Sequence, residues 1–153
     1  MINIKMLKKL DLSGAIMIEG FPGIGLVGPM AISYIIDKLG MAYIGYMESE
    51  EFPPLVSIHK GEPMPPVRLY YSEKFKIATI FAEFALPVEL VGSITNAVYS
   101  FITANKIKEI ISISGIPSSE GGVHSFAIAS LNSLNAEIQK AGMKPIEEGV
   151  ASG

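Results

Sequence analysis

The chain has 153 residues, a net charge of −3 and no cysteine. Its length corresponds to one domain, and the lack of cysteine excludes disulfides, thiolate metal sites and a cysteine nucleophile, as is typical of a cytoplasmic protein. Charged residues make up 18%, against roughly 25% in soluble domains, which predicts an apolar surface and self-association.

Two classes of partner are disfavoured by the composition. Arg68 is the single arginine and the lysines form no basic stripe, which argues against nucleic-acid binding. The longest uncharged stretch, residues 20–36, is interrupted by prolines and glycines and falls short of the ~20 apolar residues that span a membrane. We therefore expect neither a nucleic acid nor a membrane as partner.

Apolar, strand-like runs alternate with helical patterns along the chain. The first strand, residues 15–19, leads through a glycine-rich loop to a helix over residues 29–39, which Gly40 closes as a C-cap. A strand at 42–47 follows, and later a nearly all-apolar strand at 76–82, as expected of a strand covered on both faces. The remaining predicted elements are helices at 87–104 and 131–141 and strands at 109–114, 125–130 and 143–147.

The alternation is interrupted after the second strand. Five prolines between Glu48 and Tyr71 exclude a helix, and two short strands, residues 55–59 and 67–71, flank a turn-rich loop. This pattern predicts a β-hairpin insertion. With it, the chain is expected to form a single domain over residues 1–153, a three-layer αβα fold with a mostly parallel sheet.

The strand at 109–114 is apolar, which places Ile111 in the predicted core. Truncation of a core isoleucine to alanine costs about 2–5 kcal/mol, and we expect this cost at Ile111.

The most informative motif is GFPGIGLVG at residues 20–28, which contains a complete G-x-G-x-x-G in Gly23, Gly25 and Gly28. Between a strand and a helix, such glycines admit a dinucleotide pyrophosphate to the helix N-terminus. Pro29 opposes this interpretation, because proline is tolerated at the first helical position but not deeper. We therefore expect the helix to begin at Pro29, with Gly28 as its cap and a positive φ at Gly23.

Polar residues lie at the carboxyl ends of three predicted strands, where open α/β sheets bind ligands. Two carboxylates at such a position could perform acid–base chemistry, although polar residues also return at strand ends, and glycines close turns, without any function. Neither histidine has the neighbours of a zinc site, so we expect no metal, no cofactor and no catalytic residue. The candidates for a small-molecule pocket are Glu19, Glu83, Ser114, Gly115 and the loop glycines Gly23, Gly25 and Gly28.

Four short motifs stand in an order that is similar to a known family. GFPGIGLVG follows the first strand and Phe52-Pro53-Pro54 follows the second. ISISGI at residues 111–116 and GVASG at residues 149–153 come later. Together they resemble the proteasome assembly chaperone family in its archaeal and bacterial branch, over nearly the whole chain.

This resemblance implies an α/β/α fold, similar to nucleoside phosphorylase-like domains, in a non-enzymatic protein that forms homo-oligomers and acts on α subunits of the 20S proteasome. Some members have been described as ATP-grasp-type enzymes. In the family, a C-terminal hydrophobic-Tyr-any tail can bind the α-ring. This chain ends Ala151-Ser152-Gly153 without such a tail, and we expect it to be truncated at its C-terminus. The alternative function is a nucleotide- or phosphate-binding domain or enzyme that uses the Gly23/Gly25/Gly28 loop.

Overall fold

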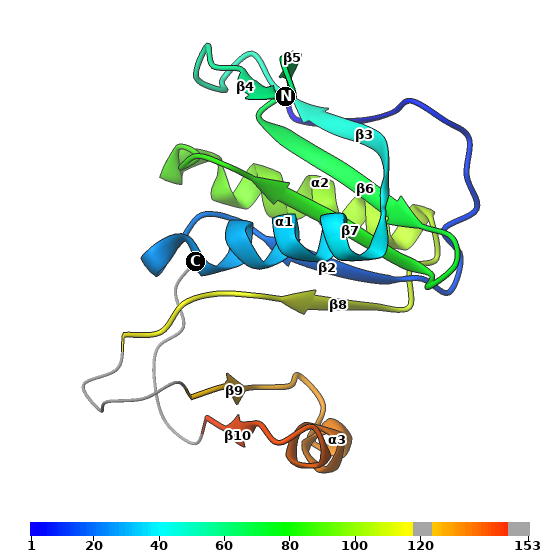
Figure 1. The fold of residues 1–153 in the computed structure, drawn as a ribbon, viewed down its shortest axis with the longest axis vertical. Coiled ribbons are helices and arrows are strands. Elements are labelled where there is room, and N and C mark those ends of the chain that lie inside the picture. The colour runs from blue at the N-terminus through cyan, green and yellow to red at the C-terminus, as the bar shows by residue number, and fades with distance from the viewer. Residues whose placement is uncertain (118–123, 147–153) are drawn as a thin grey trace. The chain divides into compact units, whose positions relative to one another are not determined.

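The structure is a computed structural model that describes residues 1–117 and 124–146. The described residues form two compact units, one of residues 1–115 and one of residues 116–117 and 124–146 (Figure 1). No helix in the described ranges is long and apolar enough to cross a membrane.

A six-stranded sheet is the centre of the first unit. Its strands are, in spatial order, β1 (Asn3–Met6), β3 (Ala42–Glu48), β6 (Val67–Ser72), β7 (Ile77–Ala82), β2 (Ile16–Gly20) and β8 (Glu109–Ser112). β7, β2 and β8 pair in parallel, whereas β1, β3, β6 and β7 pair antiparallel. The sheet is therefore mixed rather than mostly parallel, because no helix connects β3 to β6 or β6 to β7 and the chain returns antiparallel.

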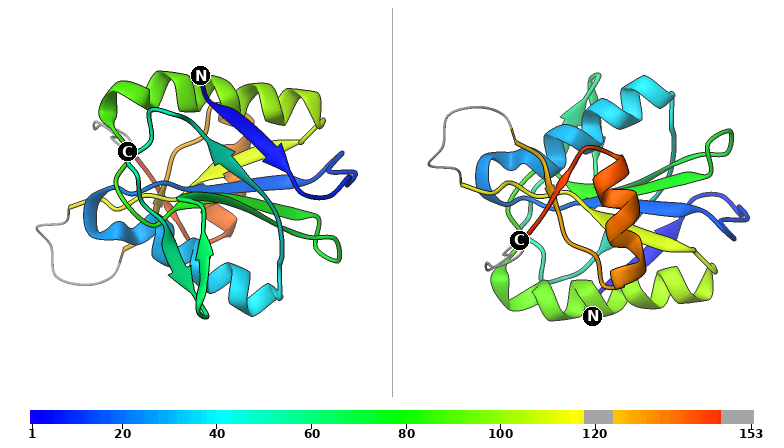
Figure 2. Two further views of the ribbon diagram at one scale, coloured as in Figure 1. Left: turned by 90° about the horizontal axis from the view of Figure 1, so that it is seen from above. Right: turned by 90° about the horizontal axis from the view of Figure 1, so that it is seen from below.

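Two helices cover opposite faces of this sheet (Figure 2). They are α1 (Val27–Leu39) and α2 (Val91–Ala104), preceded by the 3-10 turns η1 (Ile24–Leu26) and η2 (Val88–Leu90). Gly40 ends α1 with a φ of +55°, as predicted for the C-cap. The predicted three-layer α/β class is thus confirmed for the first unit.

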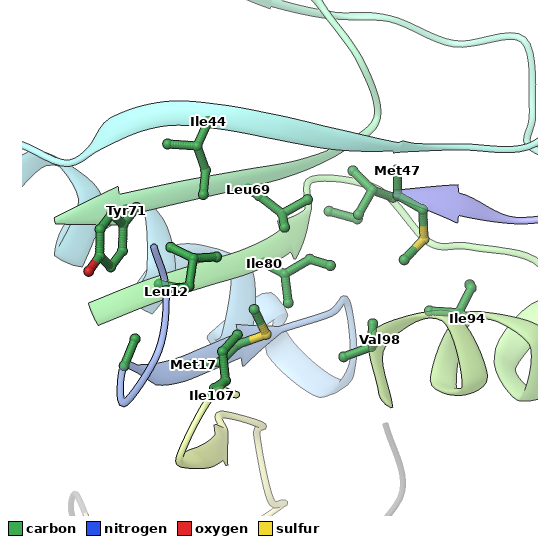
Figure 3. Packing of buried hydrophobic residues seen from close by; sticks show 14 of the residues in the cluster. Leu12, Met17, Ile44, Met47, Leu69, Tyr71, Ile80, Ile94, Val98 and Ile107 are labelled. Atoms are coloured by element: carbon green, nitrogen blue, oxygen red, sulfur yellow. The ribbon is translucent and has the colours of Figure 1, made fainter. Parts of the chain in front are cut away.

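The two faces of the sheet bury separate hydrophobic clusters, because successive side chains of a strand point to opposite sides. On the α2 side Met17, Leu69 and Ile80 pack against Ile94 and Val98 (Figure 3). On the α1 side Ile32 packs with Tyr70 and Phe81. The core of the unit therefore lies on both sides of β2, β6 and β7.

The proline-rich insertion is a hairpin of β4 (Ser57–His59) and β5 (Glu62–Met64). Its turn, Lys60 and Gly61, has φ angles of +52° and +85°, as in the tight turns that match strand twist. The predicted second arm at 67–71 is wrong, because those residues form β6, every residue of which is buried in the sheet.

The two edge strands of the sheet, β1 and β8, both differ from the prediction. β1 was absent from the prediction, although Asn3–Met6 alternates exposed and half-buried residues. β8 is the opposite edge strand, and its Ile110 and Ile111 are 44% and 41% exposed. The prediction that Ile111 belongs to the core is therefore wrong, since an apolar run does not distinguish an edge strand from a central one.

The second unit is small. Its two strands pair in parallel with each other, and its helical elements are shorter than predicted. The elements are β9 (Phe126–Ala127), η3 (Asn132–Leu134), α3 (Asn135–Lys140) and β10 (Lys144–Pro145). Residue 147 of the predicted last strand, most of the predicted loop at 115–122 and the GVASG motif lie outside the described residues.

Candidate functional site

The GFPGIGLVG segment forms a close connection between β2 and α1. A Cβ atom on Gly20 would lie 2.6 Å from the Gly28 carbonyl oxygen, and one on Gly28 would lie 2.6 Å from the Ile113 carbonyl oxygen. A Cβ atom on Gly115 would overlap the Ile24 carbonyl oxygen. Because only hydrogen fits at these positions, the glycines let the start of α1 approach the ends of β2 and β8.

The start of α1 differs from the prediction. The helix begins at Val27, so Gly28 is buried inside the first turn and is not the cap. Pro29 is the third helical residue, and its missing N–H is tolerated there because the first N–H groups of a helix have no intrahelical partner. The helix therefore begins two residues earlier than Pro29, and its third motif glycine packs against the sheet.

The left-handed backbone of the loop also lies elsewhere than expected. Gly23 is extended, with a φ of −144°, so the prediction of a positive φ there is wrong. Gly25 has a φ of +69°, and Leu26, which precedes α1, has a φ of +53°. A leucine in this region is uncommon, and the side chain of Leu26 is about half exposed.

This geometry leaves few donors for a phosphate. The N-terminus of α1 has no side-chain cap, which would favour an anion. However, the Leu26 N–H already donates to the Gly23 carbonyl oxygen at 3.1 Å, and Pro29 has no N–H. At most the amides of Val27 and Gly28 remain in the first turn, and Gly28 is buried.

Glu19 ties the ends of β2 and β8 together. Its carboxylate accepts a hydrogen bond from the Ser112 hydroxyl and one from the Phe21 N–H at 3.3 Å. The backbone carbonyl of Glu19 accepts the N–H of Ile113 at 2.9 Å. These bonds continue the register in which Glu19 lies opposite Ser112, so the carboxylate stabilises the strand ends.

Glu83, the second candidate carboxylate, pairs with the single arginine. The Arg68 Nη2 atom lies 2.7 Å from the Glu83 Oε1 atom. The Arg68 side chain is 2% exposed, whereas that of Glu83 is 36% exposed. Burial raises the pKa of Glu83, but Ser57, the charge and hydrogen bond of Arg68 and the charge of His59 together outweigh burial and lower the pKa below its ordinary value. Glu83 is therefore held ionised.

The two candidate carboxylates are not brought together. Met17 belongs to the cluster on the α2 side and Ile18 packs on the α1 side, so Glu19 points to the α2 side. Glu83 binds Arg68, whose guanidinium lies 5.1 Å from the ring centre of Phe81 on the α1 side. The arrangement provides two separate carboxylate sites and no paired acid and base.

The remaining candidates lie around the glycine loop. Ser114 is exposed beyond the end of β8, beside Gly115, which contacts η1. The structure thus brings Gly115 to the loop that contains Gly23 and Gly25. Whether a ligand binds there stays a prediction.

Sequence reasoning missed two features of the first unit. Arg68 lies in the middle of an apolar run, and a lone arginine in such a run signals a buried charge with a partner. The second is the location of the predicted apolar surface on the outer sides of both helices, with Met30 66% and Tyr34 63% exposed on α1 and Tyr99 69% exposed on α2. The signal for it is the absence of any charged residue from Val91 to Ala104.

Comparison with known proteins decides the family. A model described as the PAC2 family matches residues 17–153. The chain belongs to the PAC2 family. The resemblance to proteasome assembly chaperones is confirmed by this match and by similarity to solved archaeal homologues.

Among solved structures, this PAC2 chain is similar to Pyrococcus furiosus PbaA, described as an archaeal homologue of proteasome-assembly chaperone. The two are 30% identical with a TM-score of 0.85, over 98% of this chain and 66% of PbaA. Pyrococcus furiosus PbaB, described as an archaeal proteasome activator, has the same fold at 22% identity and a TM-score of 0.79, over 99% of this chain and 70% of PbaB.

A curated relative is the uncharacterized protein MJ0106 of Methanocaldococcus jannaschii. It is 38% identical over 109 residues, which are 71% of this PAC2 chain and 44% of MJ0106. The chain thus spans less than half the length of this relative and just under two thirds of PbaA.

Proposed function

We propose that this PAC2 chain is a non-enzymatic protein-interaction module that assists proteasome assembly. In this proposal it works in the cytoplasm as a homo-oligomer and binds α subunits of the 20S proteasome. Membership of the PAC2 family and the similarity to PbaA, a homologue of a proteasome-assembly chaperone, support the proteasome as the partner.

The uncharged outer face of α2 is the observation that carries this proposal. No residue from Val91 to Ala104 is charged, although one side of the helix is exposed. The exposed Thr95 and Thr103 hydroxyls donate to the carbonyls of Val91 and Tyr99, at 2.8 and 2.9 Å. Their hydrogen-bonding capacity is thus used inside the helix, which favours contact with protein over contact with water.

The test uses the full chain and purified α subunits from the same organism. We expect the chain to co-elute with α subunits and to increase the amount of α-ring on native gels. Tyr99→Glu should weaken both effects, because it adds a charge to the uncharged face. Lys74→Gln is the control, since it changes the net charge equally in the exposed β6–β7 turn. Failure of the unmodified chain to bind α subunits or to affect ring formation would contradict the proposal.

A nucleotide- or phosphate-binding role is the second proposal, favoured by the uncapped N-terminus of α1 beside the glycine loop. The shortage of free amides there makes it the weaker one. Saturating ligand stabilises a fold by a few kcal/mol, so ATP, NAD or inorganic phosphate should raise the melting temperature. No rise with any of these ligands at millimolar concentration would contradict this role.

A further inference from the structure

Arg68 has more hydrogen-bond donors than the described chain can satisfy. An arginine side chain carries five N–H donors, and Nη2 is paired with Glu83. The Nε and Nη1 atoms are buried, and neither has a hydrogen-bond partner within residues 1–117 and 124–146. Buried donors without an acceptor are strongly disfavoured, most of all on a charged group. Two of the three guanidinium nitrogens, Nε and Nη1, therefore lack an acceptor among the described residues.

The surroundings of this guanidinium are aromatic and polar. Arg68 lies opposite Tyr46 on β3 and opposite Phe81 on β7, so these three side chains share one face of the sheet. Tyr43 and Tyr70 form the neighbouring row, with ring centres 5.4 Å apart. Burial raises the pKa of both tyrosines, so their hydroxyls remain protonated and able to donate.

The β4–β5 hairpin lies on the same side of the sheet as α1 (Figure 2). Its strands pair only with each other, and Pro53-Pro54 and Pro65-Pro66 flank it. Ser57 of β4 acts on the Glu83 carboxylate and helps to lower its pKa, which connects the hairpin to the arginine pair. A separate two-stranded element held by a polar contact can open without breaking the central sheet.

We propose that Arg68 anchors a binding site for a carboxylate group and that the β4–β5 hairpin is the lid of this site. Nη2 carries two hydrogens and pairs with Glu83, so one of the two edges that it forms with Nε and with Nη1 still offers two parallel N–H donors to the oxygens of a carboxylate. This site goes beyond the proposed chaperone function and does not depend on it.

The charges favour a carboxylate over a phosphate. Arg68 and Glu83 together are neutral, so a bound carboxylate leaves one net negative charge in a buried place. A phosphate dianion would leave two, and the charge of His59, which also acts on Glu83, would offset at most one of them. The cost of burying charge rises steeply with uncompensated charge. The carboxylate is supplied either by a small organic acid or by a protein side chain or C-terminus.

The single arginine makes a direct experiment possible. In the intact 15N-labelled chain, one Nε–H resonance in the arginine region of the NMR spectrum belongs to Arg68. We expect sodium acetate or succinate, or a short peptide with a free C-terminal carboxylate, to shift this resonance in a saturable way at constant ionic strength. Sodium chloride, inorganic phosphate and the same peptide with an amidated C-terminus should leave it unchanged.

The titrations with small acids and with peptides distinguish the two sources of the carboxylate. Saturation by acetate or succinate alone assigns a small organic acid, and saturation by the free peptide alone assigns a protein carboxylate. No shift with any carboxylate, or an equal shift with phosphate, overturns the proposal.

Two variants test the anchor and the lid. Arg68→Lys keeps the charge but loses the two parallel N–H donors of the guanidinium. It should weaken carboxylate binding about tenfold or more, measured as the ligand concentration needed for thermal stabilisation. Ser57→Ala should speed solvent exchange of the Arg68 Nε–H, whereas Ile58→Ala, at an exposed position of the same hairpin, should not. Equal exchange rates in the two hairpin variants would overturn the assignment of the hairpin as lid.

Discussion

Gly28 is enclosed by backbone atoms, which cannot rotate away from an added side chain. A Cβ atom there would lie 2.6 Å from the Ile113 carbonyl oxygen and 3.0 Å from the Gly20 Cα atom. We expect Gly28→Ala to lower the free energy of unfolding by about 1–3 kcal/mol. Gly92→Ala is the matched control, because Gly92 is also helical and nothing lies within 4 Å of its Cβ position. The control should be neutral or stabilising by up to about 1 kcal/mol. Urea unfolding compares the two, and equal midpoints would contradict the close approach.

The ion pair of Glu83 and Arg68 predicts a dependence of stability on pH. The pKa of Glu83 is lowered from its ordinary value of 4.5. The ionised carboxylate therefore stabilises the fold fully above pH 4.5, and this contribution is lost as pH falls through the folded-state pKa.

Glu83→Gln should remove this contribution and lower the free energy of unfolding at pH 7 by about 1–3 kcal/mol, since it leaves the buried guanidinium without its charge partner. The difference from the unmodified chain should shrink below pH 4.5. Chemical unfolding at several pH values measures it. A difference between the two proteins that is constant with pH would show that Glu83 is not held by Arg68.

At the scale of elements, the position of a strand in the sheet decides how much its apolar residues contribute to stability. Ile80 lies in β7 and is fully buried, whereas Ile111 lies in the edge strand β8 and is 41% exposed. We expect Ile80→Ala to cost about 2–5 kcal/mol of unfolding free energy and Ile111→Ala less than about 1.5 kcal/mol. Denaturant unfolding of both variants is the measurement. A larger cost at Ile111 than at Ile80 would mean that β8 is covered.

Local sequence patterns predicted which helices and strands form better than they predicted which strands lie side by side in the sheet. The apolar run of β7 and the Gly40 cap of α1 could be predicted from composition and spacing, and both are present. The alternation of exposed and half-buried residues in β1 could also have been found. Which strand pairs with which could not be predicted, because strand pairing depends on contacts between distant segments.

The candidate site illustrates the same limit. Glu19 and Glu83 both lie at the carboxyl ends of strands, as predicted, yet the alternation of side chains sends them to opposite faces of the sheet. The pairing of Arg68 with Glu83 arises only because β6 and β7 are antiparallel neighbours. A periodic pattern cannot indicate such a contact before the pairing of the strands is known.

At the scale of the whole molecule, the low proportion of charged residues has a structural explanation. α1 and α2 lie on opposite faces of the sheet (Figure 2), and each has exposed uncharged residues, Met30 and Tyr34 on α1 and Tyr99 on α2. Charges on α1 are restricted to Asp37 and Lys38 in its last turn. In the proposed homo-oligomer, these two surfaces would let one subunit contact a second copy and a different partner at the same time.

If α1 packs against a second copy, a charge in the middle of its outer face should separate the subunits. Met30 is 66% exposed, and Met30→Lys would bury an uncompensated charge in the interface, which is strongly disfavoured. We expect this variant to sediment as a smaller species than the unmodified chain. Asp37→Asn is the matched control, because it changes the net charge equally at the charged end of the same helix, and it should sediment as the unmodified chain does. Identical sedimentation of all three proteins would place the self-association surface away from α1.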